Sequence, residues 1–174
     1  YLIPETMTEE GIVNLLRTTF DQKIPDAEKI KAADLNLDFQ AVLILASLIE
    51  REAKFAVDRP QIAGVLLNRL SISMPLQIDA TVQYAIASDN CTVDNIDCNW
   101  WPKTIDTSFK SSYNTYLIPN LPPSPICNPG FAAIAAVLNP SQNNYLYYLS
   151  EDSGKTHYSE TLEEHNQKIE KYLR

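Results

Sequence analysis

The sequence predicts an α+β fold led by helices, with one small β-hairpin and a C-terminal helix near its end. Three observations indicate this fold. An apolar run of helical length covers residues 41–49, two strand-like segments flank a turn at 151–154, and a hydroxyl residue at 159 or 161 begins a last helical segment. With 45% hydrophobic residues, residues 1–174 are expected to form a single domain with a substantial core.

The first predicted helix is the centre of this domain. Asp38 or Asn36 supplies its N-cap, and the helix is expected to run to about Lys54. It is apolar on nearly all sides, which is typical of a buried helix surrounded by other elements. Its apolar positions are Ala41, Val42, Leu43, Ile44, Leu45, Leu48 and Ile49.

Two further helices are predicted after it. Asp58, Arg59 and Pro60 are typical of an N-cap followed by proline in the first turn, and this helix is expected to run to about Leu70. Asp79 is predicted to cap a third helix over residues 80–87.

Residues 88–129 differ from the rest of the chain in composition. They are rich in Asn, Asp, Ser and Pro, and they include the aromatic residues Trp100, Trp101, Tyr113 and Tyr116. A loop of this length inside a compact domain is usually functional or disordered, and the aromatic residues favour a functional loop.

Helix and strand signals return after this loop. Asn128 and Pro129 open a helix expected over residues 130–138. Residues 145–150 and 156–159 are expected to pair as a hairpin, and the last helix is expected to run to Leu173.

The three cysteines leave one without a partner in any pairing. Cys91 and Cys98 bracket a polar loop, which suits a short disulfide in an oxidising compartment, although Cys127 could replace either partner. Unpaired cysteines are the alternative. The chain has no C-x-x-C pair and only two histidines, which argues against a zinc site.

The charge and hydropathy of the chain limit its partners. A formal net charge of −8 without a basic stripe argues against a nucleic-acid partner. No apolar run approaches the roughly 20 residues that a membrane helix needs. Because the chain begins at Tyr1 without an initiator Met, we expect a fragment, with any anchor or export signal upstream of it.

Two glutamates stand near the C-terminal end of the central helix. Two residues apart, they point about 200° away from each other and cannot share one role. Glu52 follows Leu45, Leu48 and Ile49 by seven, four and three residues, which places it on an apolar stripe, whereas Glu50 follows a less apolar track. Desolvation on such a stripe raises the pKa of a carboxyl group, as a general acid requires. The alternative is that Glu52 ends the stripe or pairs with an arginine.

Several other side chains are candidates for binding sugars. Asn68 and Gln77 suit hydrogen bonds to hydroxyl and N-acetyl groups, although surface amides are common. Thr81 belongs to the same polar group. Asp79 is better explained by its predicted capping role.

Aromatic and histidine side chains supply further candidates. Tyr113 and Asn114 belong to a segment in which aromatic rings alternate with hydrogen-bonding groups, although such rings are more often part of a core. His157, on the second predicted strand, is the histidine more suited to line a site, and a structural role is its alternative.

Motifs follow one another in a fixed order along the chain. They occupy residues 1–6, 46–53, 58–70, 74–82, 112–116, 121–126, 128–130, 145–147 and 156–166. In this order the chain resembles the YceG-like (MltG) endolytic murein transglycosylases over nearly its whole length.

The resemblance implies an enzyme of the cell envelope, outside the cytoplasm and tethered to the cytoplasmic membrane by an N-terminal helix that this fragment lacks. It implies cleavage of the β-1,4 bond between N-acetylmuramic acid and N-acetylglucosamine inside peptidoglycan strands. The products would be 1,6-anhydro ends, and the strands would be limited in length. Expected partners are the glycan strands and the cell-wall synthases, and a wall-binding module is expected outside the fragment.

The catalytic Glu of the family is the second of a Glu-x-Glu pair, which maps to Glu52 and implies a lysozyme-like catalytic glutamate on a buried helix. Glu52 would protonate the glycosidic oxygen and later accept the proton of the muramic C6 hydroxyl, so that no cofactor or metal is needed. The residues expected to support or position the substrate are Glu50, Asn68, Gln77, Asp79, Thr81, Tyr113, Asn114 and His157.

Two alternatives stay open. A muramidase-type hydrolase would give reducing ends and use a second carboxylate, for which Asp79 is the one candidate. A non-catalytic peptidoglycan-binding module would keep the pocket without turnover. Residues 88–104 depart from the family motifs and either reshape the glycan groove or form a braced loop, and an extracytoplasmic location favours the Cys91–Cys98 disulfide.

Overall fold

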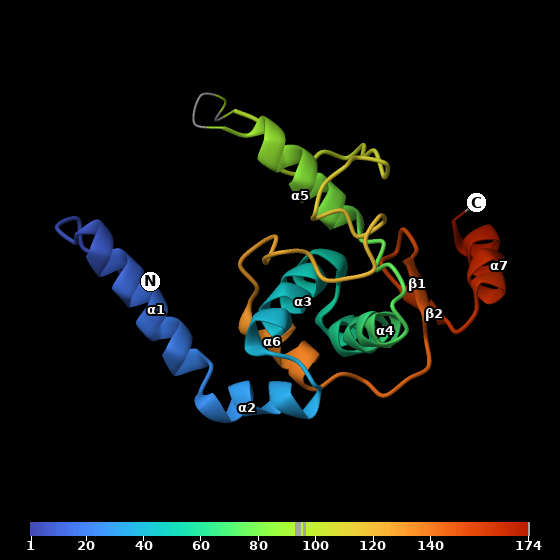
Figure 1. Cartoon of the computed structure of the whole chain (residues 1–174), viewed down its shortest axis with the longest axis horizontal. Helices are drawn as coiled ribbons and strands as arrows, with labels where there is room; N and C mark the ends of the chain where they lie inside the picture. Colours follow the sequence, from blue (N-terminus) through green and yellow to red (C-terminus); the bar gives the residue numbers. More distant parts are fainter. Residues whose placement is uncertain (93–94, 96, 174) are drawn as a thin grey trace.

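The structure, a computed structural model, describes residues 1–92, 95 and 97–173. Within these residues it is mostly helical, with a small antiparallel hairpin followed by a last helix, which confirms the predicted order of elements from α3 onward (Figure 1). The elements are α1 (Glu9–Lys23), α2 (Asp26–Asp34), α3 (Phe39–Glu52), η1 (Ala56–Asp58), α4 (Arg59–Ser71), α5 (Asp79–Asn90), α6 (Phe131–Leu138), β1 (Tyr147–Ser150), β2 (Thr156–Ser159) and α7 (Leu162–Tyr172).

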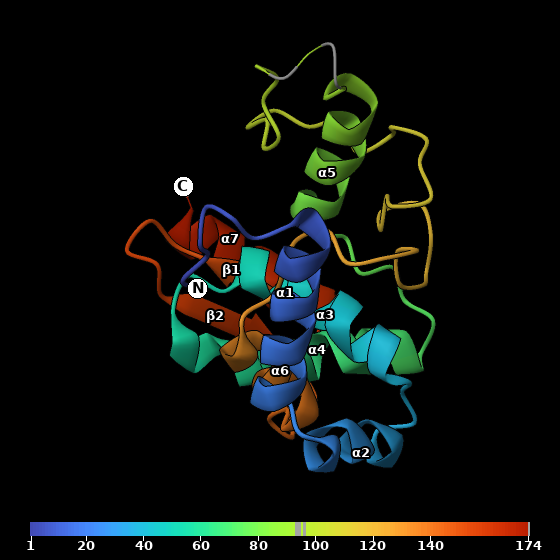
Figure 2. The ribbon, with the colours of Figure 1, turned by 90° about the vertical axis from the view of Figure 1, so that its left-hand side faces the viewer.

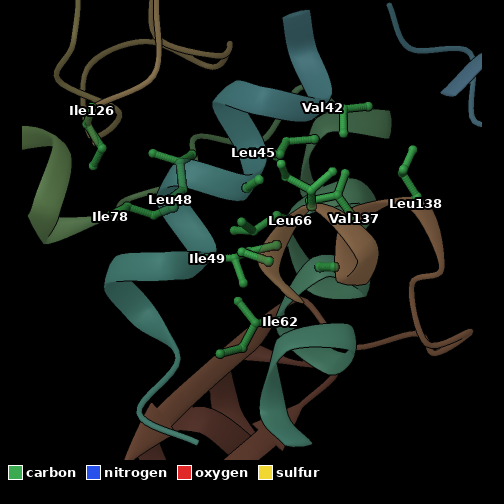
Figure 3. Close-up of a cluster of buried hydrophobic side chains, with 14 of the residues drawn as sticks. Val42, Leu45, Leu48, Ile49, Ile62, Leu66, Ile78, Ile126, Val137 and Leu138 are labelled. Carbon is green, nitrogen blue, oxygen red and sulfur yellow. The ribbon is translucent and has the colours of Figure 1, made fainter. Parts of the chain in front are cut away.

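The core surrounds α3, as the apolar run of this helix predicted. Helices α4 and α6 pack against α3, and their apolar side chains point toward one another between the three helices (Figure 3). Leu48 and Ile49 of α3 are fully buried, and a buried leucine or isoleucine contributes about 1.5–3 kcal/mol to stability. The packing therefore holds α3 firmly up to its C-terminal end.

The two ends of α3 have clear local causes. The carboxylate of Asp38 caps the helix by accepting a hydrogen bond from the backbone N–H of Ala41 at 2.6 Å, which decides between the two predicted caps. The helix ends at Glu52, because Ala53 adopts an extended conformation (φ −81°, ψ 107°). Glu52 is thus the last helical residue, two positions before the predicted end.

Asp79 does not cap a helix, and this prediction was wrong. It is the first residue of α5, Ile78 occupies the N-cap position, and no side chain caps the helix. The carboxylate of Asp79 instead accepts a hydrogen bond from the hydroxyl of Tyr116 at 2.5 Å.

Asp58 shows a similar preference for a distant partner. It occupies the N-cap position of α4 as predicted, but its side chain makes no capping hydrogen bond. Its carboxylate accepts hydrogen bonds from the hydroxyls of Thr156 at 3.0 Å and Tyr158 at 3.1 Å, both on β2. Asp58 therefore ties the hairpin to the start of α4.

The hairpin and α7 form a small layer beside the helical core. Strand β1 pairs with β2 in antiparallel register, with Tyr148 opposite Tyr158 and Leu149 opposite His157. Helix α7 packs on both strands and is capped by Thr161, whose hydroxyl accepts a hydrogen bond from the N–H of Glu164. Figure 1 shows the hairpin between α4 and α7.

Three helices lie at the margins of the core. Helices α1 and α2 were not predicted, and α1 contributes no buried residue. Figure 2 shows α1 in front of the helical core. Helix α5 extends away from the core and leads into a loop that is closed by a disulfide between Cys91 and Cys98, whereas Cys127 is a free thiol. No single described helix is long and apolar enough to cross a membrane, and only α2 and α3 together, bent by 91°, meet those criteria.

Replacing Gly64 by alanine tests the closest approach in the fold. A Cβ atom at position 64 would lie 2.5 Å from the carbonyl oxygen of Ser141 and 2.6 Å from Nδ2 of Asn143. Helix propensity alone predicts that alanine stabilises α4 by about 1 kcal/mol, whereas this overlap predicts a loss of about 1–3 kcal/mol. We expect Gly64→Ala to lower the free energy of unfolding in urea, and a more stable variant would contradict the packing of residues 141–143 on α4.

Candidate active site

Glu52 lies in the wall of a pocket with a volume of about 610 Å³. The pocket is formed where the end of α3, the turn before α5, strand β1 and helix α7 meet. Its polar lining residues are Arg51, Glu52, Arg69, Gln77, Asp79, Tyr116, Tyr147, Tyr148, Ser150, His165 and Asn166.

The surroundings of Glu52 favour its protonated form. Desolvation by the protein around the carboxyl is the largest influence and raises its pKa. The hydroxyl of Tyr148 donates a hydrogen bond to Oε2 of Glu52 at 2.8 Å and opposes this rise, the charge of Asp79 adds to it, and the charge of Arg51 opposes it. The position of Glu52 at the C-terminal end of α3 acts in the same direction as desolvation, because the carbonyls there carry partial negative charge.

Asp79 supplies the second carboxylate of the pocket. Its bond from the Tyr116 hydroxyl orients the carboxylate, and burial together with Asp79 raises the pKa of Tyr116 well above the usual range of a tyrosine. Tyr116 is therefore a neutral hydrogen-bond donor at neutral pH. No sequence pattern indicated a contact between these two residues, which are 37 positions apart.

Arg69 organises the turn that carries Gln77. Its guanidinium donates hydrogen bonds to the carbonyl oxygens of Leu146, Pro75 and Leu76 at 2.6, 3.1 and 2.8 Å. Gln77 has a positive φ of 54°, an unusual conformation for a residue other than glycine. The exposed side chain of Gln77 borders the pocket as a result.

Glu50 lies outside the pocket, where two partners bind its carboxylate. One of its carboxylate oxygens pairs with the guanidinium of Arg59 at 3.3 Å, and the other accepts a hydrogen bond from the N–H of Gly130 at 3.1 Å. These contacts join α3 to the beginnings of α4 and α6. Among the predicted site residues, Glu52, Gln77 and Asp79 line the pocket and Glu50 does not.

Asn68 and Thr81 also point away from the pocket. The amide of Asn68 donates to the carbonyl oxygens of Asn143 at 2.9 Å and Tyr145 at 3.0 Å, and the residue borders a separate pocket of about 460 Å³. Thr81 is buried, and its hydroxyl bonds to that of Thr115 at 2.9 Å. Both side chains hold neighbouring segments of the chain together.

Tyr113 and Asn114 organise the loop before α6. The hydroxyl of Tyr113 shares a hydrogen bond with that of Ser124 at 2.6 Å. The buried amide of Asn114 donates to the carbonyl oxygens of Thr107 at 3.0 Å and Phe109 at 2.7 Å. Neither residue lines the pocket around Glu52.

His157 lies on the hairpin but faces away from Glu52. Its ring stacks on that of Tyr172, with 3.8 Å between ring centroids, and its Nε2 lies 3.2 Å from a carboxylate oxygen of Glu151. The histidine that lines the pocket is His165 of α7, whose pKa is lowered by burial.

Tyr148 and Arg69 are the main site residues that were not predicted. Tyr148 belongs to the predicted strand, and Arg69 follows Asn68 directly, so both lie within recognised segments. The contact between Tyr148 and Glu52 could not be predicted, because the two residues are 96 positions apart and only folding brings β1 beside the end of α3. In the part of the chain that the structure describes, no group of three or more His, Cys, Asp or Glu side chains could hold a metal ion.

Comparison with known proteins gives consistent results. A model of the YceG-like family matches residues 1–171. An endolytic murein transglycosylase of Bacillus subtilis is 35% identical over 170 residues, covering 98% of this chain and 44% of that protein. One of Streptococcus pneumoniae strain D39 is 30% identical over 175 residues, covering 99% of this chain and 31% of that protein.

A solved structure supports the same relationship. The crystal structure of a YceG-like protein from Listeria monocytogenes is similar to this chain, with a TM-score of 0.81 and 34% sequence identity. The similarity covers 96% of this chain and 52% of that one. This chain thus spans less than half the length of the curated relatives that it matches.

Replacing Glu52 by glutamine tests whether burial of the Glu52 carboxyl group lowers the stability of the protein at neutral pH. Because the folded-state pKa of Glu52 lies above its ordinary value of 4.5, the stability linked to its proton is complete below about pH 4.5 and is lost as the pH rises through the folded-state pKa. Glu52→Gln should therefore be more stable than the original protein at pH 7 by about 1–3 kcal/mol, the usual penalty for a desolvated polar group. Chemical denaturation at pH 4 and pH 7 measures this difference, which should shrink at pH 4.

Glu50→Gln is the matched control. It changes the same charge on the same helix, but it removes the ion pair with Arg59, so we expect it to destabilise the protein at pH 7. The same sign for both variants would contradict the distinction between the two glutamates.

Proposed function

The chain belongs to the YceG-like family, as its motifs predicted, and we propose that it is the catalytic part of an endolytic murein transglycosylase. Its substrate would be the glycan strand of peptidoglycan. It would cut the β-1,4 bond between N-acetylmuramic acid and N-acetylglucosamine and leave a 1,6-anhydro end on the muramic acid.

One observation carries this proposal. A glutamate that ends the central helix is desolvated, has a raised pKa and opens onto a pocket large enough for sugar units. A raised pKa favours the protonated form of the carboxyl group, which can donate its proton to a leaving oxygen. The family relationship makes the glycosidic oxygen of peptidoglycan the expected acceptor.

The proposed reaction needs no water. Glu52 donates its proton to the glycosidic oxygen while the bond from this oxygen to the muramic C1 breaks, and positive charge spreads over C1 and the ring oxygen. The C6 hydroxyl oxygen of the same sugar then bonds to C1, and its proton passes to the Glu52 carboxylate. One carboxyl group acts first as acid and then as base, so the reaction requires neither a cofactor nor a metal.

The neighbours of Glu52 suit this cycle. The Tyr148 hydroxyl bonds to one carboxyl oxygen, which leaves the other oxygen for the proton transfer and stabilises the carboxylate once the proton has left. Gln77 borders the same pocket with an exposed amide that suits an N-acetyl or hydroxyl group.

The presence of Asp79 favours a muramidase-type hydrolase as the second candidate. An inverting or retaining hydrolase requires a second carboxylate near the reacting carbon, and Asp79 lines the same pocket and raises the pKa of Glu52. The products distinguish the two reactions, because hydrolysis gives a reducing end.

We place the activity in the cell envelope, outside the cytoplasm. The disulfide between Cys91 and Cys98 suits an oxidising compartment, and the murein named for the relatives lies there. The relatives are more than twice as long as this chain, so a membrane anchor and a wall-binding module belong to the proposal for the whole protein, as does work beside the cell-wall synthases.

Mass spectrometry of digested glycan strands tests the proposed reaction. Uncrosslinked strands treated with the protein should yield products with 1,6-anhydro-muramic ends. Glu52→Gln should lower the rate of cleavage by about 10²–10⁴-fold, the usual contribution of a general acid. Asp79→Asn should retain the anhydro product.

Glu50→Gln serves as control, because it alters a carboxylate on the same helix that lies outside the pocket. Reducing ends that disappear in Asp79→Asn would identify the hydrolase. Binding of strands without cleavage, unchanged by Glu52→Gln, would identify a non-catalytic module.

The pH profile of Tyr148→Phe tests the role of the tyrosine. Because the Tyr148 hydroxyl lowers the pKa of Glu52, its removal should move the alkaline limb of kcat/KM to higher pH, since a general acid must keep its proton. Tyr147→Phe is the matched control, because Tyr147 is the neighbouring residue on β1 and lines the same pocket without a bond to Glu52. An alkaline limb that stays in place in Tyr148→Phe would contradict this role.

A further inference from the structure

The pocket of an acidic protein contains two arginines that have no acidic partner. The whole chain has a formal net charge of −8, yet Arg51 and Arg69 both line the pocket around Glu52. In the described part of the chain, neither arginine takes part in any ion pair with a carboxylate.

Aromatic rings and carbonyl groups hold these arginines in place. The guanidinium of Arg51 lies 3.7 Å from the centre of the Trp101 ring, and that of Arg69 lies 5.2 Å from the centre of the Tyr147 ring. Such contacts orient a guanidinium without neutralising its charge. Arg69 is only 7% exposed, and the carbonyl oxygens that it contacts are neutral as well.

Trp101 reaches Arg51 from the segment that departs from the family motifs. The amide of Gln83 on α5 donates to the carbonyl oxygen of Pro102 at 2.9 Å, and the Cys91–Cys98 disulfide closes the preceding loop. This segment therefore presents a tryptophan to the residue beside Glu52.

The other titratable groups of the pocket do not cancel the two positive charges. Burial raises the pKa of Glu52, which favours the neutral form of its carboxyl group, and the pKa of His165 is lowered by burial, by Arg69 and by Lys168. Asp79 is the one remaining carboxylate among the described lining residues, and it already accepts a hydrogen bond from Tyr116. The pocket thus has an excess of positive charge in a protein that repels anions overall.

We propose that Arg51 and Arg69 bind a carboxylate of the substrate, carried on the 3-O-lactyl arm of a muramyl residue. This inference rests on the proposed function, because it names the form of the glycan that the same pocket prefers. A guanidinium donates strong, charge-assisted hydrogen bonds to a carboxylate. In Arg69 the Nε and Nη1 groups already donate to carbonyl oxygens, so its Nη2 group is the donor proposed for the substrate. A neutral sugar polymer would leave both cations without a counter-ion.

The carboxylate can come from two parts of the substrate. In strands from which the stem peptides have been removed, the lactyl group itself ends in a carboxylate. In strands that keep their stems, the lactyl group is an amide and the carboxylates belong to the peptide.

Binding to chemically matched strands tests the proposal without changing either arginine. Three preparations are compared: stripped strands with free lactyl carboxylates, the same strands with these groups converted to methylamides, and strands with intact stems. Affinities are measured by fluorescence anisotropy with Glu52→Gln, which keeps both arginines, and with the original protein at a temperature that slows cleavage. We expect methylamide formation to weaken binding by about tenfold, the effect of one charge-assisted hydrogen bond, and added salt to reduce this difference.

A variant of Arg51 connects the effect to the pocket. In Arg51→Gln the preference for the carboxylate should fall below about threefold, whereas Arg17→Gln, the same change of charge on the outlying helix α1, should leave it at about tenfold. Arg69 is not replaced, because its hydrogen bonds to backbone carbonyls stabilise the fold. The comparison of charged and neutral strands tests its role in binding instead.

Each outcome is decisive. Tighter binding of stripped strands identifies the lactyl carboxylate, and tighter binding of strands with intact stems, lost when the stem carboxylates are amidated, identifies the peptide. Equal affinity for the charged and neutral strands overturns the proposal, even where cleavage with anhydro products supports the proposed function. A preference for carboxylates without any cleavage would support this inference while the proposed function fails.

Discussion

The partial burial of the Glu52 carboxyl at the end of a core helix is the constraint on which the rest of the site depends. A carboxylate in this position is unfavourable, because it is desolvated and lies at the negative end of the helix dipole. The packing of α3 against α4 and α6 prevents the helix end from moving toward solvent. The fold therefore keeps the group in place and shifts its protonation, which is the property that an acid catalyst requires.

The two glutamates of α3 show that positions only two residues apart on one helix can have different roles, because they point to different sides of the helix. Glu50 meets Arg59 and the N–H of Gly130, so its charge is compensated and it joins three helices. Glu52 points to the other side and meets a tyrosine hydroxyl at the pocket wall. Glu50 therefore stabilises the packing of the helices, whereas Glu52, two residues later, faces the pocket.

Long-range hydrogen bonds between aspartates and hydroxyl groups build the walls of the pocket. Asp58 holds the hairpin that carries Tyr148, and Asp79 holds Tyr116. Arg69 contributes in the same way by binding carbonyl oxygens on both sides of the pocket. These residues therefore define the pocket by joining segments that lie far apart in the sequence.

The sequence by itself determined the order of the elements from α3 onward, the burial of α3 and the orientation of Glu52 along an apolar stripe, because these follow from local spacing and from the period of the helix. It also indicated Gln77 as a polar neighbour of the site. Only the tertiary structure decided which polar residues meet in the pocket. Asp79 bonds to Tyr116 and does not cap a helix. Asn68 and Asn114 donate hydrogen bonds to backbone carbonyls and do not line the pocket. Tyr148 and Arg69 line the pocket from two segments that no local pattern connects. The physical reason is that a polar side chain takes the partner that folding brings nearest to it, and the spacing of residues along the chain contains no information about that partner.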